Sequence, residues 1–296
     1  MGTTGGGKQE DVSYASFMSS KAFEFLVGPD KKPFILHSEL VASLSSVLEK
    51  LVKGNMEEAQ KGSVVWEHVD EQTFIRFSQY AYMRTYEYPA FRPRPQPKAG
   101  PSKASLLAVL CRYSCSSASR FLAEDSLDDL TDANTERDSY RYKYRSSMLR
   151  MCDDSWEAFF ENEPPLPSHL TKVAMKRASP LADGERNDAE LLLSHARLYV
   201  LADCYGITPL MELSLSTLYS VLTEFMEWDD VADMLIKLLR YCFENDTPAE
   251  LREFVMRYAV CHIEDLWKRK EVIELAWTHA DFSSAIVEAM LYSLKW

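Results

Sequence analysis

Apolar residues in the first part of the chain follow a pattern that predicts two strands joined by a turn. The runs 23–27 and 33–37 are rich in strand formers, and the residues between them, Gly28-Pro29-Asp30-Lys31-Lys32, favour a turn. We therefore predict a β-hairpin at this position.

The next stretch alternates between helical and strand patterns. Apolar positions recur at helical spacing from 38 to 53, and we expect a break at Ser45-Ser46. An acidic link at 56–58 leads to a short strand at 63–67, and an amphipathic helix then begins beside Asp70, which is a good N-cap residue. The predicted order is strand, strand, helix, strand, helix.

Composition changes sharply at Tyr88-Pro89, where a proline-rich stretch begins that is incompatible with a helix. We interpret 89–189 as a long, largely disordered insertion. Its one candidate for ordered structure is 155–160, which contains a tryptophan and two phenylalanines.

The last third of the chain is predicted to be helical throughout. Gly206 stands where the first of these helices would end, and Thr247-Pro248-Ala249-Glu250 has the pattern of a capping box. We predict helices at 188–206, 210–226, 231–243, from Pro248 onward, 270–279 and 283–294.

Charge and cysteine usage narrow the class of protein. The formal net charge is -12, which disfavours direct contact with nucleic-acid phosphates. Six scattered cysteines, with no apolar leader at the N-terminus, indicate reduced thiols and an intracellular location in cytoplasm, nucleus or both. Apolar stretches are too short to cross a bilayer, so we expect no membrane partner.

Residue patterns for catalysis, cofactors or metal ions are weak. We expect His37 and His195 to be structural, because neither has Cys, Asp or Glu at a recognised ligand spacing. Ser194 and His195 are adjacent on a helix and point to different sides, which argues against a hydrolase site. We therefore predict no catalytic residue, no cofactor and no metal ion.

Several separated blocks, in the same order, resemble the BTB/POZ family in the divergent form common among fungal proteins. Phe34-Ile35-Leu36-His37-Ser38-Glu39-Leu40 is similar to the family's second strand and first helix. Tyr199-Val200-Leu201-Ala202-Asp203-Cys204-Tyr205-Gly206-Ile207 is the most specific block and resembles its later helical pair. The resemblance covers about 20–88 and 190–225.

The resemblance implies an α+β fold: a small sheet flanked by helices, with the long irregular insertion and an all-helical C-terminal extension. We expect a disordered tail at 1–19 and the first part of the BTB domain at 20–88. The insertion follows at 89–189, the second part of the domain at 190–226, and the helical extension at 227–296. The resemblance further implies a protein-interaction adaptor or scaffold, not an enzyme, that acts in dimerisation or in delivering substrates to a cullin-type ubiquitin ligase.

Four residues are candidates for partner binding. Met56 and Glu58 fit the hydrophobic-x-Glu pattern of cullin-binding family members, although a solvated acidic link explains them equally well. Tyr86 and Tyr88 are further candidates, and of the neighbouring tyrosines we expect Tyr82 in the core and Tyr88 on the surface. The alternatives are a dimerising, transcription-linked scaffold without a ligase role and, more remotely, an enzyme with an unrecognised pocket.

Overall fold

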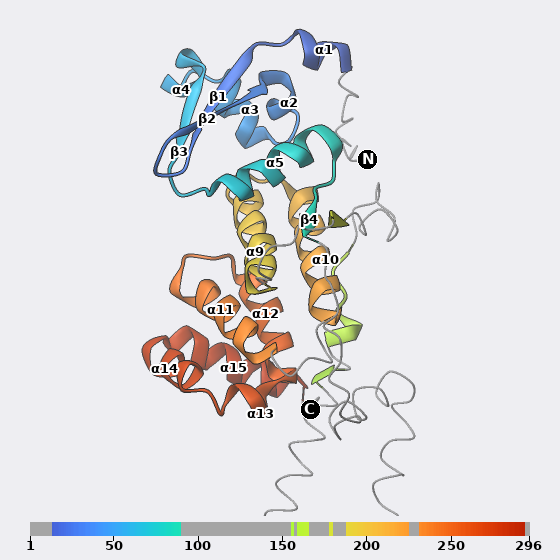
Figure 1. Cartoon of the computed structure of the whole chain (residues 1–296), viewed down its shortest axis with the longest axis vertical. Helices are drawn as coiled ribbons and strands as arrows, with labels where there is room; N and C mark the ends of the chain where they lie inside the picture. The colour runs from blue at the N-terminus through green and yellow to red at the C-terminus, as the bar shows by residue number, and fades with distance from the viewer. Residues whose placement is uncertain are drawn as a thin grey trace, which may run out of the picture.

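The protein has a mixed α+β fold in which a small sheet stands at one end of a long helical body. The computed structural model describes residues 14–89, 155–156, 159–165, 178–179, 188–224 and 231–293. Figure 1 shows the sheet and the helices of residues 14–83 at one end, the two helices of residues 188–224 running lengthwise in the middle, and the helices of residues 231–293 at the other end.

The sheet has three strands in the order β2-β1-β3. Strands β1 (Ala22–Val27) and β2 (Lys32–His37) form the predicted antiparallel hairpin, which is confirmed. Its turn includes Gly28, whose φ of 75° suits a residue without a Cβ. Strand β3 (Ser63–Trp66) pairs in parallel with β1 on the other side, so the first and third strands in sequence run in the same direction.

The predicted break in the first helix is confirmed. Helix α2 (Ser38–Ala42) ends before Ser45, which caps α3 (Ser46–Lys53) by accepting a hydrogen bond from the Leu48 N–H at 3.1 Å. The Ser45 hydroxyl also donates to the Tyr205 carbonyl at 2.6 Å, which joins the start of α3 to a residue 160 positions later in the chain.

Two further helices complete the sheet end. Asp70 caps α5 (Glu71–Met83) through the Thr73 N–H, as predicted. The predicted acidic link at 56–58 is wrong in part, because Glu57–Lys61 form the short helix α4. An additional short helix, α1 (Tyr14–Ser19), precedes β1.

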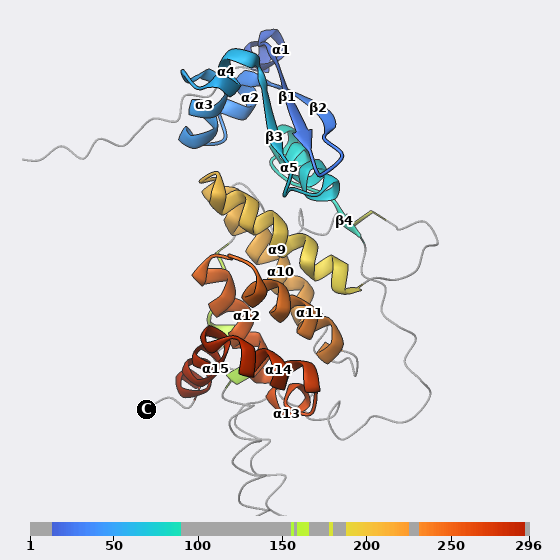
Figure 2. The same ribbon diagram turned by 90° about the vertical axis from the view of Figure 1, so that its left-hand side faces the viewer.

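Helices α9 (Asp188–Cys204) and α10 (Thr208–Glu224) form a hairpin that connects the two ends of the molecule (Figure 2). Gly206 lies between them with a φ of 63°, in the left-handed conformation expected at a helix C-terminus. Helix α10 begins at Thr208 rather than at the predicted 210. Leu198 packs in the core below the sheet, whereas Leu192 packs in the core of the helical end.

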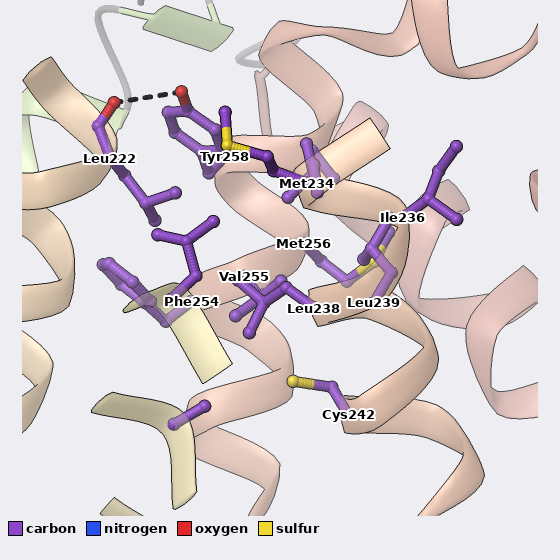
Figure 3. Packing of buried hydrophobic residues seen from close by; sticks show 14 of the residues in the cluster. Leu222, Met234, Ile236, Leu238, Leu239, Cys242, Phe254, Val255, Met256 and Tyr258 are labelled. Atoms are coloured by element: carbon purple, nitrogen blue, oxygen red, sulfur yellow. Dashed lines mark hydrogen bonds between the residues drawn. The ribbon is translucent and has the colours of Figure 1, made fainter. Parts of the chain in front are cut away.

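The C-terminal extension is helical, as predicted. Its core is apolar, and Figure 3 shows its packing, including a hydrogen bond from the Tyr258 hydroxyl to the Leu222 carbonyl. The helices are α11 (Val231–Glu244), α12 (Ala249–Cys261), α13 (Ile263–Leu266), α14 (Lys270–Thr278) and α15 (Ala280–Ser293).

Two details of these helices differ from the prediction. Helix α15 begins three residues before the predicted 283. The capping box before α12 is wrong: Pro248 takes the N-cap position, and the Thr247 hydroxyl donates backwards to the Cys242 carbonyl at 2.7 Å. The hydroxyl therefore stabilises the end of α11 instead of the start of α12.

Most of the predicted insertion lies outside the described residues, and its expected disorder stays a prediction. At its start, β4 (Tyr88–Pro89) pairs in parallel with β5 (Ala178–Ser179), which lies near its end. The expected ordered stretch is helical at Ser155, Trp156 and from Phe159 to Glu161, and Phe159 is buried. Across the described part of the chain, no helix is both long enough and apolar enough to span a membrane.

Candidate protein-interaction surface

The outer face of the sheet carries apolar side chains that nothing in the described structure covers. Strand pairing places Leu26 between Pro33 and Val65, so these three residues form an apolar row across all three strands. Ile35, in the adjacent row, is 66% exposed, and Val65 is 45% exposed. The opposite face is buried, because alternate residues of a strand point to opposite sides of the sheet.

The turn before α4 lies at one end of this sheet. Met56 is 63% exposed and Glu58 is half-buried. Gly62 is the C-cap residue of α4, and its carbonyl accepts the Glu24 N–H of β1 at 2.9 Å. Because Gly62 lies directly before β3, this backbone bond joins the end of α4 to the sheet. Figure 1 shows α4 at the same end of the protein as the three strands.

Two charged side chains of α4 close to Met56, Glu57 and Lys61, are exposed. Glu57 and Lys61 form an ion pair one helical turn apart. The hydrogen bond and the attraction between them lower the pKa of Glu57 and raise the pKa of Lys61. The Glu57 side chain therefore points along the helix towards Lys61. Glu57 is a suitable control position for substitutions of the neighbouring Glu58.

The end of α5 contributes a second exposed group. Tyr82 is 47% exposed, so its predicted place in the core is wrong. Its hydroxyl instead lies 2.9 Å from the His37 Nδ1 at the end of β2. Met83 follows at 50% exposure. The helix turns Tyr80 and Ala81 inward, which leaves these next two side chains facing solvent.

The other two predicted binding residues lie elsewhere. Tyr86 is 3% exposed, so it cannot contact a partner in this conformation, and its assignment to a binding surface is corrected. Its hydroxyl lies 2.9 Å from the Nδ1 of His195, a residue 109 positions away on α9. Tyr88 is half-buried and makes an edge contact with the His195 ring at 5.0 Å, so it is not the freely exposed residue we expected.

The environment of His195 is that of a neutral structural histidine. Burial lowers its pKa to about 3, and the positive charge of Arg76 adds to the effect. Burial also raises the pKa of Tyr86. The Nε2 atom of His195 is buried without a hydrogen-bond partner among the described residues. His195 is therefore uncharged and closed to solvent, and its contact with Tyr86 joins α9 to the residues that follow α5. This is the structural role that we expected of this histidine.

Among the surface grooves of the described structure, two lie at opposite ends of the protein. One of about 470 Å³ lies between α12 and α15 and is lined by both acidic and basic side chains. The other, of about 630 Å³, lies beside α1, α3 and α4. Within the described residues, no group of three or more His, Cys, Asp and Glu side chains is placed to hold a metal ion.

Comparison with protein-family models, with curated proteins and with solved structures found no match to this chain.

Sequence reasoning missed the outer face of the sheet, although a signal for it existed. Ile35 and Val65 stand at alternate positions to the buried residues of their strands, and a face argument would have placed them outside. By contrast, no local signal marks the contact between Tyr86 and His195.

Proposed function

We propose that this protein is a protein-interaction adaptor or scaffold built on a BTB/POZ-like domain. The order of elements supports the fold assignment: an antiparallel hairpin, two helices, a strand parallel to the first, a helix, and then a helical hairpin after the insertion. The α9–α10 hairpin packs against α5 and its residues complete the core below the sheet.

The observation that carries the functional proposal is the group of exposed apolar side chains at the sheet end. Ile35, Val65 and Met56 are all between 45% and 66% exposed. Apolar residues that lie side by side at a surface often mark a site of protein contact, as Leu26, Pro33 and Val65 do across the three strands, and methionine is enriched at such sites. A partner that covers them would remove apolar area from water at a favourable rate of about 25 cal/mol per Å².

The proposed partner class for the α4 turn is the N-terminal region of a cullin. In this proposal Met56 supplies an apolar anchor and Glu58 accepts a hydrogen bond from the partner. Truncation of an anchor of this kind typically costs 1 to 2 kcal/mol or more, which is a loss of affinity of about 5- to 30-fold.

The test measures binding of purified full-length protein to a purified cullin N-terminal region by calorimetry. We expect the double variant Met56→Ala/Glu58→Ala to lose affinity by the factor above, and the matched control Glu57→Ala to retain it. Absence of binding by the parent protein, or an equal loss in the control, would refute the cullin proposal.

A second candidate function is a scaffold that self-associates through the outer face of the sheet. The exposure of Ile35 and Val65 favours it. Sedimentation velocity distinguishes the two functions. Self-association is supported if the parent protein is a dimer and the variant Ile35→Asp is a monomer. The control variant Ser46→Asp, on an exposed helix surface, should remain a dimer. A parent protein that is monomeric at all concentrations would exclude it.

A further inference from the structure

A groove between α12 and α15 lies at the helical end of the protein, and its volume is about 470 Å³. Two of its lining residues, Phe243 and Met256, belong to the buried apolar core of that end. The residues that α15 contributes recur every three or four positions, which is the spacing of one helix face. They are Asp281, Ser284, Ala285, Glu288 and Ala289. The groove is therefore the seam between two packed helices, and it reaches down to the apolar core.

The two walls of the groove carry opposite net charge. The basic wall on α12 has two arginines and one glutamate, which gives a net charge of +1: Arg252, Arg257 and Glu253. The acidic wall on α15 has two carboxylates, Asp281 and Glu288, which give -2. Glu253 pairs with Arg257 on its own wall at 3.7 Å. No ion pair between described residues engages Arg252, Asp281 or Glu288, so these three charges are open to a partner.

The outer side of α15 adds an apolar strip beside the acidic wall. Val287 is 54% exposed and Leu291 is 51% exposed. They stand four positions apart, so they lie on the same face of the helix, one above the other. Phe282 and Ile286 of the same helix are buried, which places the strip on the side that faces solvent. Protein interfaces combine apolar contacts of this kind with charged and polar groups around them.

A surface with two oppositely charged halves is complementary to itself under one particular two-fold rotation. When the axis runs along the groove, the rotation turns a second copy to face the first and exchanges its two sides. The basic wall of each copy then lies opposite the acidic wall of the other, and the same patch is used twice. An axis across the groove would instead oppose like walls, which is unfavourable because like charges repel.

We propose that the groove and the apolar strip form a two-fold interface between two copies of this chain, in which the basic wall of each copy meets the acidic wall of the other. Figure 1 shows α12 and α15 at the opposite end of the protein from the sheet. The interface is therefore separate from the sheet surface, and it does not rest on either function proposed above.

The size of the surface predicts a weak dimer. Helices α12 and α15 have 13 and 14 residues, so each is about 20 Å long. Two packed helices, each about 10 Å in diameter, present a face about 20 Å wide, and its projected area is about 400 Å². A standard stable interface removes about 800 Å² of each partner from solvent. We therefore expect a Kd in the micromolar range rather than an obligate dimer.

The test measures self-association of the full-length protein by sedimentation velocity from about 1 to about 200 µM. Every protein carries Ile35→Asp, so that the sheet face does not contribute, and we expect a reversible dimer. Arg252→Glu changes the basic wall from +1 to -1, and Asp281→Arg/Glu288→Arg changes the acidic wall from -2 to +2. Each change opposes like charges across the two-fold axis and should weaken the dimer at least about tenfold.

The two charge variants should restore binding to each other. In a mixed dimer the -1 wall of one variant meets the +2 wall of the other, and the -2 wall meets the +1 wall. An equimolar mixture should therefore dimerise at least about tenfold more tightly than either variant alone. A mixture that stays monomeric at concentrations where the Ile35→Asp protein dimerises would overturn the proposal.

A matched control separates the interface from a general effect of charge. Lys237 of α11 is exposed and does not line the groove, so Lys237→Glu should leave the Kd unchanged. Equal weakening by Lys237→Glu and Arg252→Glu, or an Ile35→Asp protein that is monomeric at every concentration, would refute the interface. Conversely, the Arg252→Glu background isolates the sheet face, so the two self-association surfaces are tested separately.

A second variant decides the case if circular dichroism shows that a charge variant is unfolded. Val287→Ser/Leu291→Ser changes only exposed side chains, so the helical core is not altered. Loss of the apolar strip should weaken the dimer of the Ile35→Asp protein at least about tenfold. An unchanged Kd would show that this side of α15 does not take part in self-association.

Discussion

The buried histidine of α9 makes the stability of this protein depend on pH in a calculable way. Burial lowers the pKa of His195 from 6.5 to about 3 in the folded protein. The unfolded chain therefore binds a proton as the pH falls through 6.5, while the folded protein does not. The free energy of unfolding decreases with falling pH, because the state that binds more protons is favoured.

The magnitude follows from the two pKa values. Stability contributed by neutral His195 is complete above pH 6.5 and declines by up to about 1.4 kcal/mol per pH unit between 6.5 and 3. Integrated from pH 7 to pH 5, the loss is about 2 kcal/mol. His262 shifts in the same direction, so the parent protein loses stability from both residues.

The assay is urea unfolding of parent and His195→Gln at pH 7 and pH 5. Glutamine cannot take up a proton, so the variant should lose about 2 kcal/mol less than the parent between these two values. The exposed His68 provides the control, since His68→Gln should show the parent's pH dependence. Equal pH dependence in parent and His195→Gln would refute the buried, neutral state of His195.

Two further substitutions test the structural hydrogen bonds, both by urea unfolding at pH 7. Ser45→Ala removes the α3 cap and the bond to the Tyr205 carbonyl, and should cost about 1 to 2 kcal/mol, whereas Ser46→Ala at the exposed next position should cost little; similar values for the two would contradict the double role of Ser45. Tyr258→Phe removes the buried bond to the Leu222 carbonyl and should cost about 1 kcal/mol, so an unchanged midpoint would show that this bond does not tie α12 to α10.

Much of the secondary structure was readable from the sequence. The turn at Gly28, the cap at Asp70 and the helix end at Gly206 each depend on the preference of one residue for a local backbone conformation. Where the local prediction was wrong, a neighbouring group competed for the same atoms. The Thr247 hydroxyl, for example, donates a hydrogen bond to the Cys242 carbonyl instead of capping the next helix.

The candidate site was predicted only in part. Met56 and Glu58 lie at the surface, but Tyr86 is buried, and the exposed Ile35 and Val65 were not singled out. Hydropathy alone does not say which apolar residues a fold leaves uncovered, because that depends on whether another element packs on the face that carries them.

Periodicity and capping act over a few residues, so the hairpin, β3 and the long helices could be predicted from the pattern, whereas α1, α4, α13 and the β4–β5 pair could not. Which distant segments meet is visible only in the folded molecule: β3 beside β1, His195 against Tyr86, and Phe159 among the rings of α10 and α12. These contacts depend on long-range packing. A local sequence pattern shows that a side chain is apolar, but many apolar side chains fit the same pattern, so the partner of each is defined only in the assembled core.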